Sequence, residues 1–358
     1  MTLLTLLRSG IGGIRTIWES IAGDDERVHI INYKLDCRNY IDRDGTFCFD
    51  IFCPKSYVFS LLKSYIASSC SPPTALVANE EFDLEYFSWA NYSAPLTYIA
   101  HVNGDHSYKA AIRFRNSIDS LYAVAEPALS FLRCRGFSSV YHLNYSISLP
   151  ILIQPPKEDI AIYVGRLACD KGLDRTLSLF KEFRKAGFSC FFIGDGPHTP
   201  SASLLDGIEV IKGISRHDLF ELMSKAKYLI LNSYLEGLPI VFFECVHYGL
   251  IPIVSYIDSS INDLLCNNYI LCSLSPHKTL NDVLSRPVNP FPVGHYRINN
   301  PALNNQLVSQ ILTHKCRPRR MLTRDLKLLD KVGNPFLARL ISLWRRYRWN
   351  MSAKTVSV

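Results

Sequence analysis

The chain has 358 residues, which is too long for one ordinary hydrophobic core and suits two domains. Hydrophobic residues make up 48% and charged residues 20%, the composition of a folded globular protein rather than of a disordered one. The formal net charge of +7 is unevenly placed, because residues 315–354 hold twelve Lys or Arg against two acidic residues. The rest of the chain is slightly acidic, so the distribution does not describe a uniformly basic nucleic-acid surface.

The eleven cysteines are scattered, form no Cys-x-x-Cys pair and are accompanied by no His cluster at zinc-ligand spacing. The first residues lack the basic and apolar regions of a secretory signal. We therefore expect a protein of the reducing cytoplasmic compartment, without a metal site. The apolar run from Leu238 to Ile257 contains Pro239, Gly249 and Pro252, which predict a buried helix followed by a buried strand rather than a membrane span.

In the first half, short apolar runs alternate with helix-length amphipathic segments, the pattern of parallel sheets covered by helices. Strands are predicted at 2–7, 28–33, 74–79, 96–102 and 120–125, and a helix at 14–22. The region from Asp36 to Cys53 fits this rhythm less well. Asp42-Arg43-Asp44-Gly45 lies there between two short strand-like runs, which favours a hairpin turn over a metal-binding Asp-x-Asp pair.

Residues 144–159 are rich in proline and acidic residues and have no helical period, so they are the best candidate linker. The alternation then restarts, with strands predicted at 160–165, 188–194, 208–213, 227–233 and 251–256, and helices at 174–187, 217–226 and 239–249. We predict a first domain at 1–145, a second at 146–310 and a basic helical tail at 311–358.

Charged residues and glycines follow the strands of the second half, where an open parallel sheet collects its ligands. Arg166 and Lys171 could converge on an anion beside a helix N-terminus, or be solvated in a surface loop. Gly194-Asp195-Gly196 would let a flat ligand approach, although such turns also close many loops without function. Glu236 precedes a helix that carries Glu244 in an apolar run, where the Glu244 carboxylate needs hydrogen bonds from a ligand or from a neighbouring backbone or Arg.

Together, VGRLACDKGLD, FIGDGP and SYLEGLPIVFFECVHYGLIPIVS closely resemble the donor-binding domain of retaining GT-B glycosyltransferases, including the E-x7-E pair Glu236 and Glu244. The resemblance covers about residues 144–265. It implies an α/β fold with two Rossmann-like parallel-sheet domains facing across a cleft. It also implies transfer of a sugar from a nucleotide-sugar donor without a metal ion or other cofactor.

Carried over to this sequence, the resemblance implies that Arg166 and Lys171 hold the donor diphosphate. Glu236, with the N–H groups of Gly237 and Leu238, would bind the transferred sugar, and Glu244 would bind the ribose. The remaining implied donor contacts line the base and are Gly194, Asp195, Gly196, Gly213 and Ile214. The family's usual glycine pair and Glu after the last strand are replaced here by Asp258-Ser259-Ser260-Ile261-Asn262-Asp263.

The first half resembles the family less. Ser9-Gly10-Ile11-Gly12-Gly13 follows the first strand like the family's glycine loop, in which Gly12 and Gly13 would face the donor phosphates. The spacing does not match the dinucleotide-binding G-x-G-x-x-G pattern. His101 ends a predicted strand where the family places a histidine of the catalytic cleft, and His106 is a weaker candidate for the same role. A histidine satisfied by local hydrogen bonds is the alternative.

The tail combines apolar positions with Arg345, Arg346, Arg348 and the aromatic residues Trp344, Tyr347 and Trp349. This pattern suits an anionic inner-membrane surface, or equally a helix packed back across the domains. The expected partners are thus a nucleotide-sugar donor, a glycan or glycolipid acceptor and a membrane surface, without nucleic acid. The sequence predicts a glycosyltransferase of bacterial lipopolysaccharide or polysaccharide assembly. A sugar-nucleotide epimerase, a catalytically silent GT-B assembly partner and, more distantly, a nicotinamide dehydrogenase are the alternatives.

Overall fold

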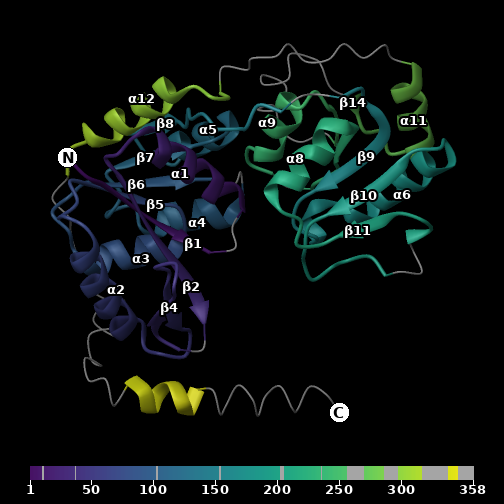
Figure 1. The fold of residues 1–358 in the computed structure, drawn as a ribbon. Helices are drawn as coiled ribbons and strands as arrows, with labels where there is room; N and C mark the ends of the chain where they lie inside the picture. Colours follow the sequence, from purple (N-terminus) through teal and green to yellow (C-terminus); the bar gives the residue numbers. More distant parts are fainter. Residues whose placement is uncertain are drawn as a thin grey trace.

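A computed structural model describes residues 1–9, 12–36, 38–101, 104–152, 155–201, 205–234, 236–255, 270–285, 297–316 and 338–345. Within these ranges the chain forms two sheets, each covered by helices on both faces (Figure 1). All strand pairs of the described residues are parallel except one short hairpin. The predicted α/β architecture with two Rossmann-like domains is therefore confirmed.

The first sheet has eight strands in the order β3-β4-β2-β1-β5-β6-β7-β8. Its interior strands are apolar on both faces, as expected where helices cover both sides. The strands are β1 (Leu3–Arg8), β2 (Val28–Asp36), β3 (Tyr40–Ile41), β4 (Phe47–Asp50), β5 (Ala75–Ala78), β6 (Leu96–Ala100), β7 (Ser120–Ala123) and β8 (Val140–His142). The helices are α1 (Gly12–Asp24), α2 (Lys55–Ser69), α3 (Glu81–Ala90), α4 (Asp105–Arg113) and α5 (Glu126–Cys134).

The region between β2 and β4 is the predicted hairpin. β3 pairs antiparallel with β4, and the Asp42 side chain closes the turn by accepting hydrogen bonds from the backbone N–H groups of Asp44 (3.0 Å) and Thr46 (2.8 Å). Gly45 adopts a φ of 75°, which favours glycine. These hydrogen bonds give Asp42 a structural role in the turn.

The second sheet has six strands in the order β11-β10-β9-β12-β13-β14. They are β9 (Glu158–Val164), β10 (Ser189–Ile193), β11 (Glu209–Ile211), β12 (Ala226–Leu231), β13 (Ile251–Val254) and β14 (Ile270–Leu271). The helices around them are α6 (Leu173–Lys185), α8 (Arg216–Lys225), α9 (Ile240–His247) and α11 (Pro276–Ser285), and a 3-10 turn, η1 (Cys169–Lys171), precedes α6. The apolar run at 238–257 divides into α9 and β13 as predicted. No helix among the described residues has both the length and the apolar character needed to cross a membrane.

The connection between the two sheets is buried rather than solvated. Tyr145, Ile147 and Leu149 are each at most 5% exposed, and Ile147 pairs with Ile298 in an isolated bridge. The chain then returns to the first domain through α12 (Pro301–Leu312), which lies against α1 (Figure 1). The Asn304 side chain donates to Asp24 at 2.7 Å. Residues 301–310, assigned from the sequence to the second domain, therefore pack on the first, because their apolar face covers α1.

Part of the basic tail is described. Residues 338–345 are helical and contact the first domain, where the Ser342 hydroxyl donates to Asp50 and Arg345 donates to the Phe52 carbonyl at 3.3 Å. The side chains of Leu340, Leu343 and Trp344 are exposed. Arg346, Tyr347, Arg348 and Trp349 lie outside the described residues.

Candidate functional site

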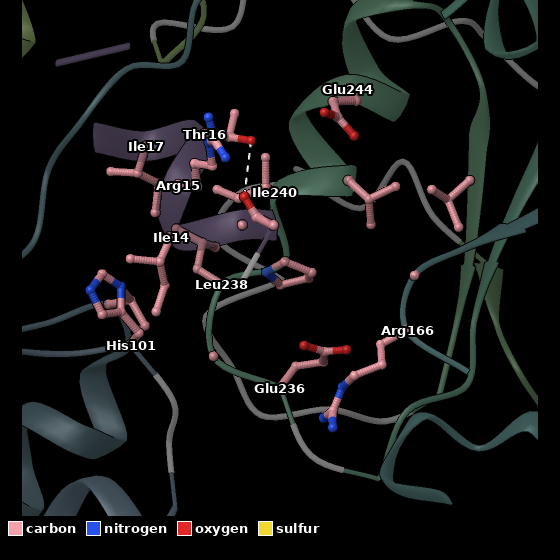
Figure 2. A pocket seen from close by; sticks show the side chains of 18 of the residues that line it. Ile14, Arg15, Thr16, Ile17, His101, Arg166, Glu236, Leu238, Ile240 and Glu244 are labelled. Carbon is pink, nitrogen blue, oxygen red and sulfur yellow. Dashed lines mark hydrogen bonds between the residues drawn. The ribbon is translucent and has the colours of Figure 1, made fainter. Parts of the chain in front are cut away.

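A cleft of about 1230 Å³ separates the carboxyl ends of the two sheets and is lined by residues of both domains. In open parallel sheets this edge holds ligands, because helix N-termini and loop side chains converge there. Most of the predicted site residues lie on it: Gly12, Gly13, His101, Arg166, Lys171, Glu236, Gly237, Leu238 and Glu244, together with the weaker candidate His106. Figure 2 shows Glu236 and Arg166 beside each other, with His101 on the opposite side.

Lys171 and Glu236 form an ion pair at the centre of the second domain's side of the cleft. The Lys171 ammonium donates to the Glu236 carboxylate at 2.7 Å, and the Ser233 hydroxyl donates to the same oxygen at 2.7 Å. Their side chains are 20% and 12% exposed, so the pair is partly desolvated. Such a pair holds both groups in one geometry, and removal of either partner leaves the other poorly satisfied.

A glycine brings Lys171 to this position. Gly172 has a φ of 60°, and a Cβ atom there would lie 1.9 Å from the Asn232 carbonyl oxygen at the end of β12. The turn η1 can therefore end against the neighbouring strand and α6 can begin, which directs Lys171 toward the loop carrying Glu236. A side chain at position 172 would force these two loops apart.

Arg166 is more exposed than Lys171. Its guanidinium pairs with Asp170 at 3.0 Å, and the Arg166 side chain is 63% exposed. The Tyr163 hydroxyl donates to the Arg166 carbonyl at 2.8 Å, which fixes the backbone rather than the guanidinium. The side chain is thus adaptable, as expected of a cation that meets a phosphate only when a ligand is present.

Glu244 is buried on α9 and is 8% exposed. Burial raises the pKa of its carboxyl group, and the nearby Arg216 guanidinium partly counteracts this. Arg216 donates to Glu244 at 3.3 Å and, across the cleft, to the Thr16 hydroxyl of α1 at 2.9 Å. The Glu244 carboxylate therefore has a neighbouring Arg as its hydrogen-bond partner, one of the possibilities that the sequence left open. The same Arg216 links the two domains.

The first domain contributes the start of α1 and His101. Gly12 has no atom within 4 Å of the position of a Cβ, whereas a Cβ on Gly13 would lie 3.3 Å from Ile240 of α9. Of the other residues of the predicted glycine loop, Ser9 also lines the cleft, and Gly10 and Ile11 lie outside the described residues. Burial lowers the pKa of His101 to about 3, so its imidazole is neutral at ordinary pH.

Five predicted base contacts lie away from the cleft lining: Gly194, Asp195, Gly196, Gly213 and Ile214. Two of these glycines have a packing reason, since a Cβ on Gly194 would lie 2.0 Å from the Gly165 carbonyl oxygen and one on Gly196 would lie 2.2 Å from that of Leu167. The Asp195 carboxylate caps the Gly196 N–H at 2.8 Å. Their contact with a base stays a prediction, as does any role of the segment from Asp258 to Asp263, which lies outside the described residues.

The sequence did not point to Arg216, to Ser233 or to Asn79, whose Oδ1 lies 2.9 Å from His101 Nε2. Arg216 begins α8 and Ser233 follows β12. Polar residues are common at such positions, so nothing in the sequence marks these two as site residues. Asn79 ends a predicted strand next to the one that ends in His101, and this position could have indicated it. Outside the cleft, His217, Asp218 and Glu221 bring possible metal-ligand atoms within 4.8 Å of one another, but all three are exposed on the first turns of α8.

The comparisons with known proteins agree with this geometry. Residues 149–285 match the family of glycosyl transferases group 1. The alpha-D-kanosaminyltransferase of Streptomyces kanamyceticus is 30% identical over 115 residues, which cover 30% of this chain and 30% of that enzyme. The amylovoran biosynthesis glycosyltransferase AmsD of Erwinia amylovora is 27% identical over 148 residues, 38% of this chain and 40% of that protein. The matches thus span well under half of these relatives.

Solved structures resemble the chain over most of its length. The apo form of the lipopolysaccharide outer core galactosyltransferase WaaB has a TM-score of 0.60 at 16% identity, covering 87% of this chain and 99% of that one. An E. coli trehalose-6-phosphate protein bound with UDP-2-fluoro glucose has a TM-score of 0.61 at 10% identity, covering 88% and 100%. At these identities the likeness shows the fold. The chain therefore has a GT-B fold, and its residues 149–285 match the model of the group 1 glycosyltransferases.

Proposed function

We propose that the protein is a retaining glycosyltransferase of the hexosyltransferase type, which moves a sugar from a nucleotide-sugar donor to a glycan or glycolipid acceptor. The observation that carries this proposal is the Lys171–Glu236 pair, which lies beside Arg166 and across the cleft from His101. AmsD is named for amylovoran biosynthesis and WaaB for the lipopolysaccharide outer core, which supports a role in bacterial surface-polysaccharide assembly.

The hydrogen-bonding capacity of the site is compatible with a bound donor. An ammonium has three N–H donors, so Lys171 can hold Glu236 and a diphosphate oxygen at once. The Glu236 carboxylate can likewise accept from sugar hydroxyls besides Lys171 and Ser233. In this proposal Arg166 and Lys171 stabilise the leaving nucleoside diphosphate without a metal ion, and Glu244 binds the ribose beside Arg216.

The first test is donor binding followed by transfer. Thermal-shift measurements with a panel of nucleotide sugars identify the donor, because specific binding stabilises the fold by mass action. Lys171→Ala and Glu236→Ala are then expected to lower kcat by roughly 100- to 1,000-fold, the usual effect of losing one charge-stabilising group. Turnover and thermal unfolding are measured for each variant.

Lys185→Ala is the matched control, because Lys185 pairs with Glu182 at 2.6 Å on the exposed face of α6. Wild-type turnover in either cleft variant contradicts the proposed site. Products from labelled donor separate transfer from epimerisation, and a protein that binds donor but transfers nothing to any acceptor supports the assembly-partner alternative.

We also propose that residues 338–345 contact an anionic membrane surface. Leu343 and Trp344 are 56% and 57% exposed on a helix that holds Arg339 and Arg345, within a segment whose formal charge is +10. The expected result is co-flotation with vesicles containing anionic lipid, weakened by high salt and by the double substitution Leu343→Ser, Trp344→Ser. Leu274→Ser, at a 97% exposed leucine of the second domain, is the control. Equal flotation of the double variant and the wild type contradicts the proposal.

A further inference from the structure

A buried hydrogen-bond network lies beneath the cleft on the side of the first domain. Asn79 follows β5 directly and His101 follows β6, and these two strands pair in parallel, so their ends lie together. Asn79 is 6% exposed, and the neighbouring Trp18 of α1 and Thr5 of β1 are fully buried. The network therefore connects the sheet, the helix that begins at the glycine loop and the histidine of the cleft.

The orientation of the Asn79 amide is fixed by its partners. The Trp18 indole N–H, which can only donate, lies 2.8 Å from Asn79 Oδ1. Asn79 Nδ2 donates to the Leu6 carbonyl at 3.1 Å and to the Thr5 hydroxyl at 2.8 Å. The Thr5 hydroxyl itself donates to the Val77 carbonyl, so it must accept from Asn79. Reversing the amide would set its NH₂ against the Trp18 N–H and its carbonyl oxygen against the Leu6 carbonyl.

This orientation also determines the protonation of His101. The His101 Nε2 atom lies 2.9 Å from Asn79 Oδ1, an acceptor, so Nε2 must carry a hydrogen. A neutral imidazole has one N–H, and burial keeps His101 neutral at ordinary pH. We infer that Asn79 is a positioning residue that fixes His101 as the Nε2–H tautomer, which leaves Nδ1 as a hydrogen-bond acceptor.

The consequence for recognition rests on the proposed function. A histidine of this tautomer in the cleft lining accepts a hydrogen bond from a ligand hydroxyl through Nδ1, but it does not donate one to a ligand oxygen. Asn79 would then set the selectivity of the cleft without touching the ligand, through the proton position on His101. A hydrogen bond from one ring nitrogen to a neighbouring side chain commonly fixes the ring orientation and tautomer of a functional histidine.

The experiment uses the full-length protein with selectively ¹⁵N-labelled histidine. The His101→Gln variant assigns the His101 signals by their loss, and the ¹⁵N shifts report the tautomer. In the wild type we expect a protonated Nε2 and an unprotonated Nδ1. In Asn79→Leu, which removes the acceptor, we expect a mixture of tautomers and a fall of roughly tenfold in kcat/KM, the size expected when a buried donor loses its partner.

Thr5→Val is the matched control, because it removes a buried hydrogen bond of the same network and leaves the Asn79–His101 contact in place. We expect it to destabilise the fold while His101 keeps the Nε2–H tautomer. Asn79→Ala, which also removes the acceptor, is the second variant for the case that Asn79→Leu does not fold, and the same mixture of tautomers is expected. Trp18→Phe leaves the acceptor in place, so it should retain the tautomer.

A wild type with protonated Nδ1 overturns the inference, as does an unchanged tautomer in Asn79→Leu or an equal change in Thr5→Val. The tautomer is read without substrate, so a wild type that transfers no sugar would contradict the proposed function and leave this result standing.

Discussion

Glu244 shows at the residue scale how a site can reduce stability. Its carboxyl pKa is raised above the ordinary value of 4.5 because burial disfavours the charged form. The folded protein therefore binds this proton more tightly than the unfolded chain does. It follows that the contribution of Glu244 to stability is most favourable below about pH 4.5 and is lost as the pH rises through the raised pKa.

We expect Glu244→Gln to be more stable than the wild type at pH 8, and this difference to shrink as the pH falls toward 4.5. The amide stays uncharged at every pH, and Arg216, whose side chain is 51% exposed, remains solvated without its partner. Thermal unfolding of both proteins between pH 4 and 8 measures the effect. Glu221→Gln, on the exposed surface of α8, is the control and should show little difference. A stability difference that does not vary with pH contradicts this account of Glu244.

At the scale of elements, five strands of the first sheet and most elements of the second could be predicted, because their apolar runs have clear lengths and boundaries. The second domain follows its prediction from β9 to β13 within one or two residues. The predicted start of α9 was one residue too early. Pro239 is the N-cap of the helix, which begins at Ile240. The hairpin before α2 was predictable as well, because Asp and Gly have local reasons to form that turn.

Contacts between distant segments could not be predicted in the same way. The packing of α12 on α1 depends on a face that any amphipathic helix could present, and Asn304 reveals its partner Asp24 only in the fold. Among the site residues, Lys171 and Glu236 were found because the motifs that hold them resemble those of a known glycosyltransferase family. Arg216 and Asn79 were not, since their roles arise from residues far away in the chain, Thr16 and His101.

At the scale of the whole molecule, the two domains meet along α1 and α9. A shared hydrophobic cluster includes Trp18 of the first domain, Tyr145 of the connection and Phe243 of the second. The rings of Tyr145 and Phe243 lie 6.2 Å apart, edge to face. Arg216 adds a polar link to Thr16 at the rim. The start of α1 is therefore both a wall of the cleft and part of the joint between the domains, so the two glycines there should differ in function.

Gly12→Ala and Gly13→Ala test this difference. The Gly12 Cβ position is open, so alanine there should leave unfolding unchanged and weaken donor binding if phosphates approach this backbone. Alanine at Gly13 would place a Cβ 3.3 Å from Ile240 Cγ1 of the other domain, a tight contact, so we expect Gly13→Ala to be less stable than Gly12→Ala. A double-mutant cycle with Ile240→Ala should show that the Gly13 penalty shrinks when the contact is removed. Equal losses of stability in both alanine variants would show that Gly13 has no tight contact with the other domain. The same would follow if the stability losses of Gly13→Ala and Ile240→Ala simply add.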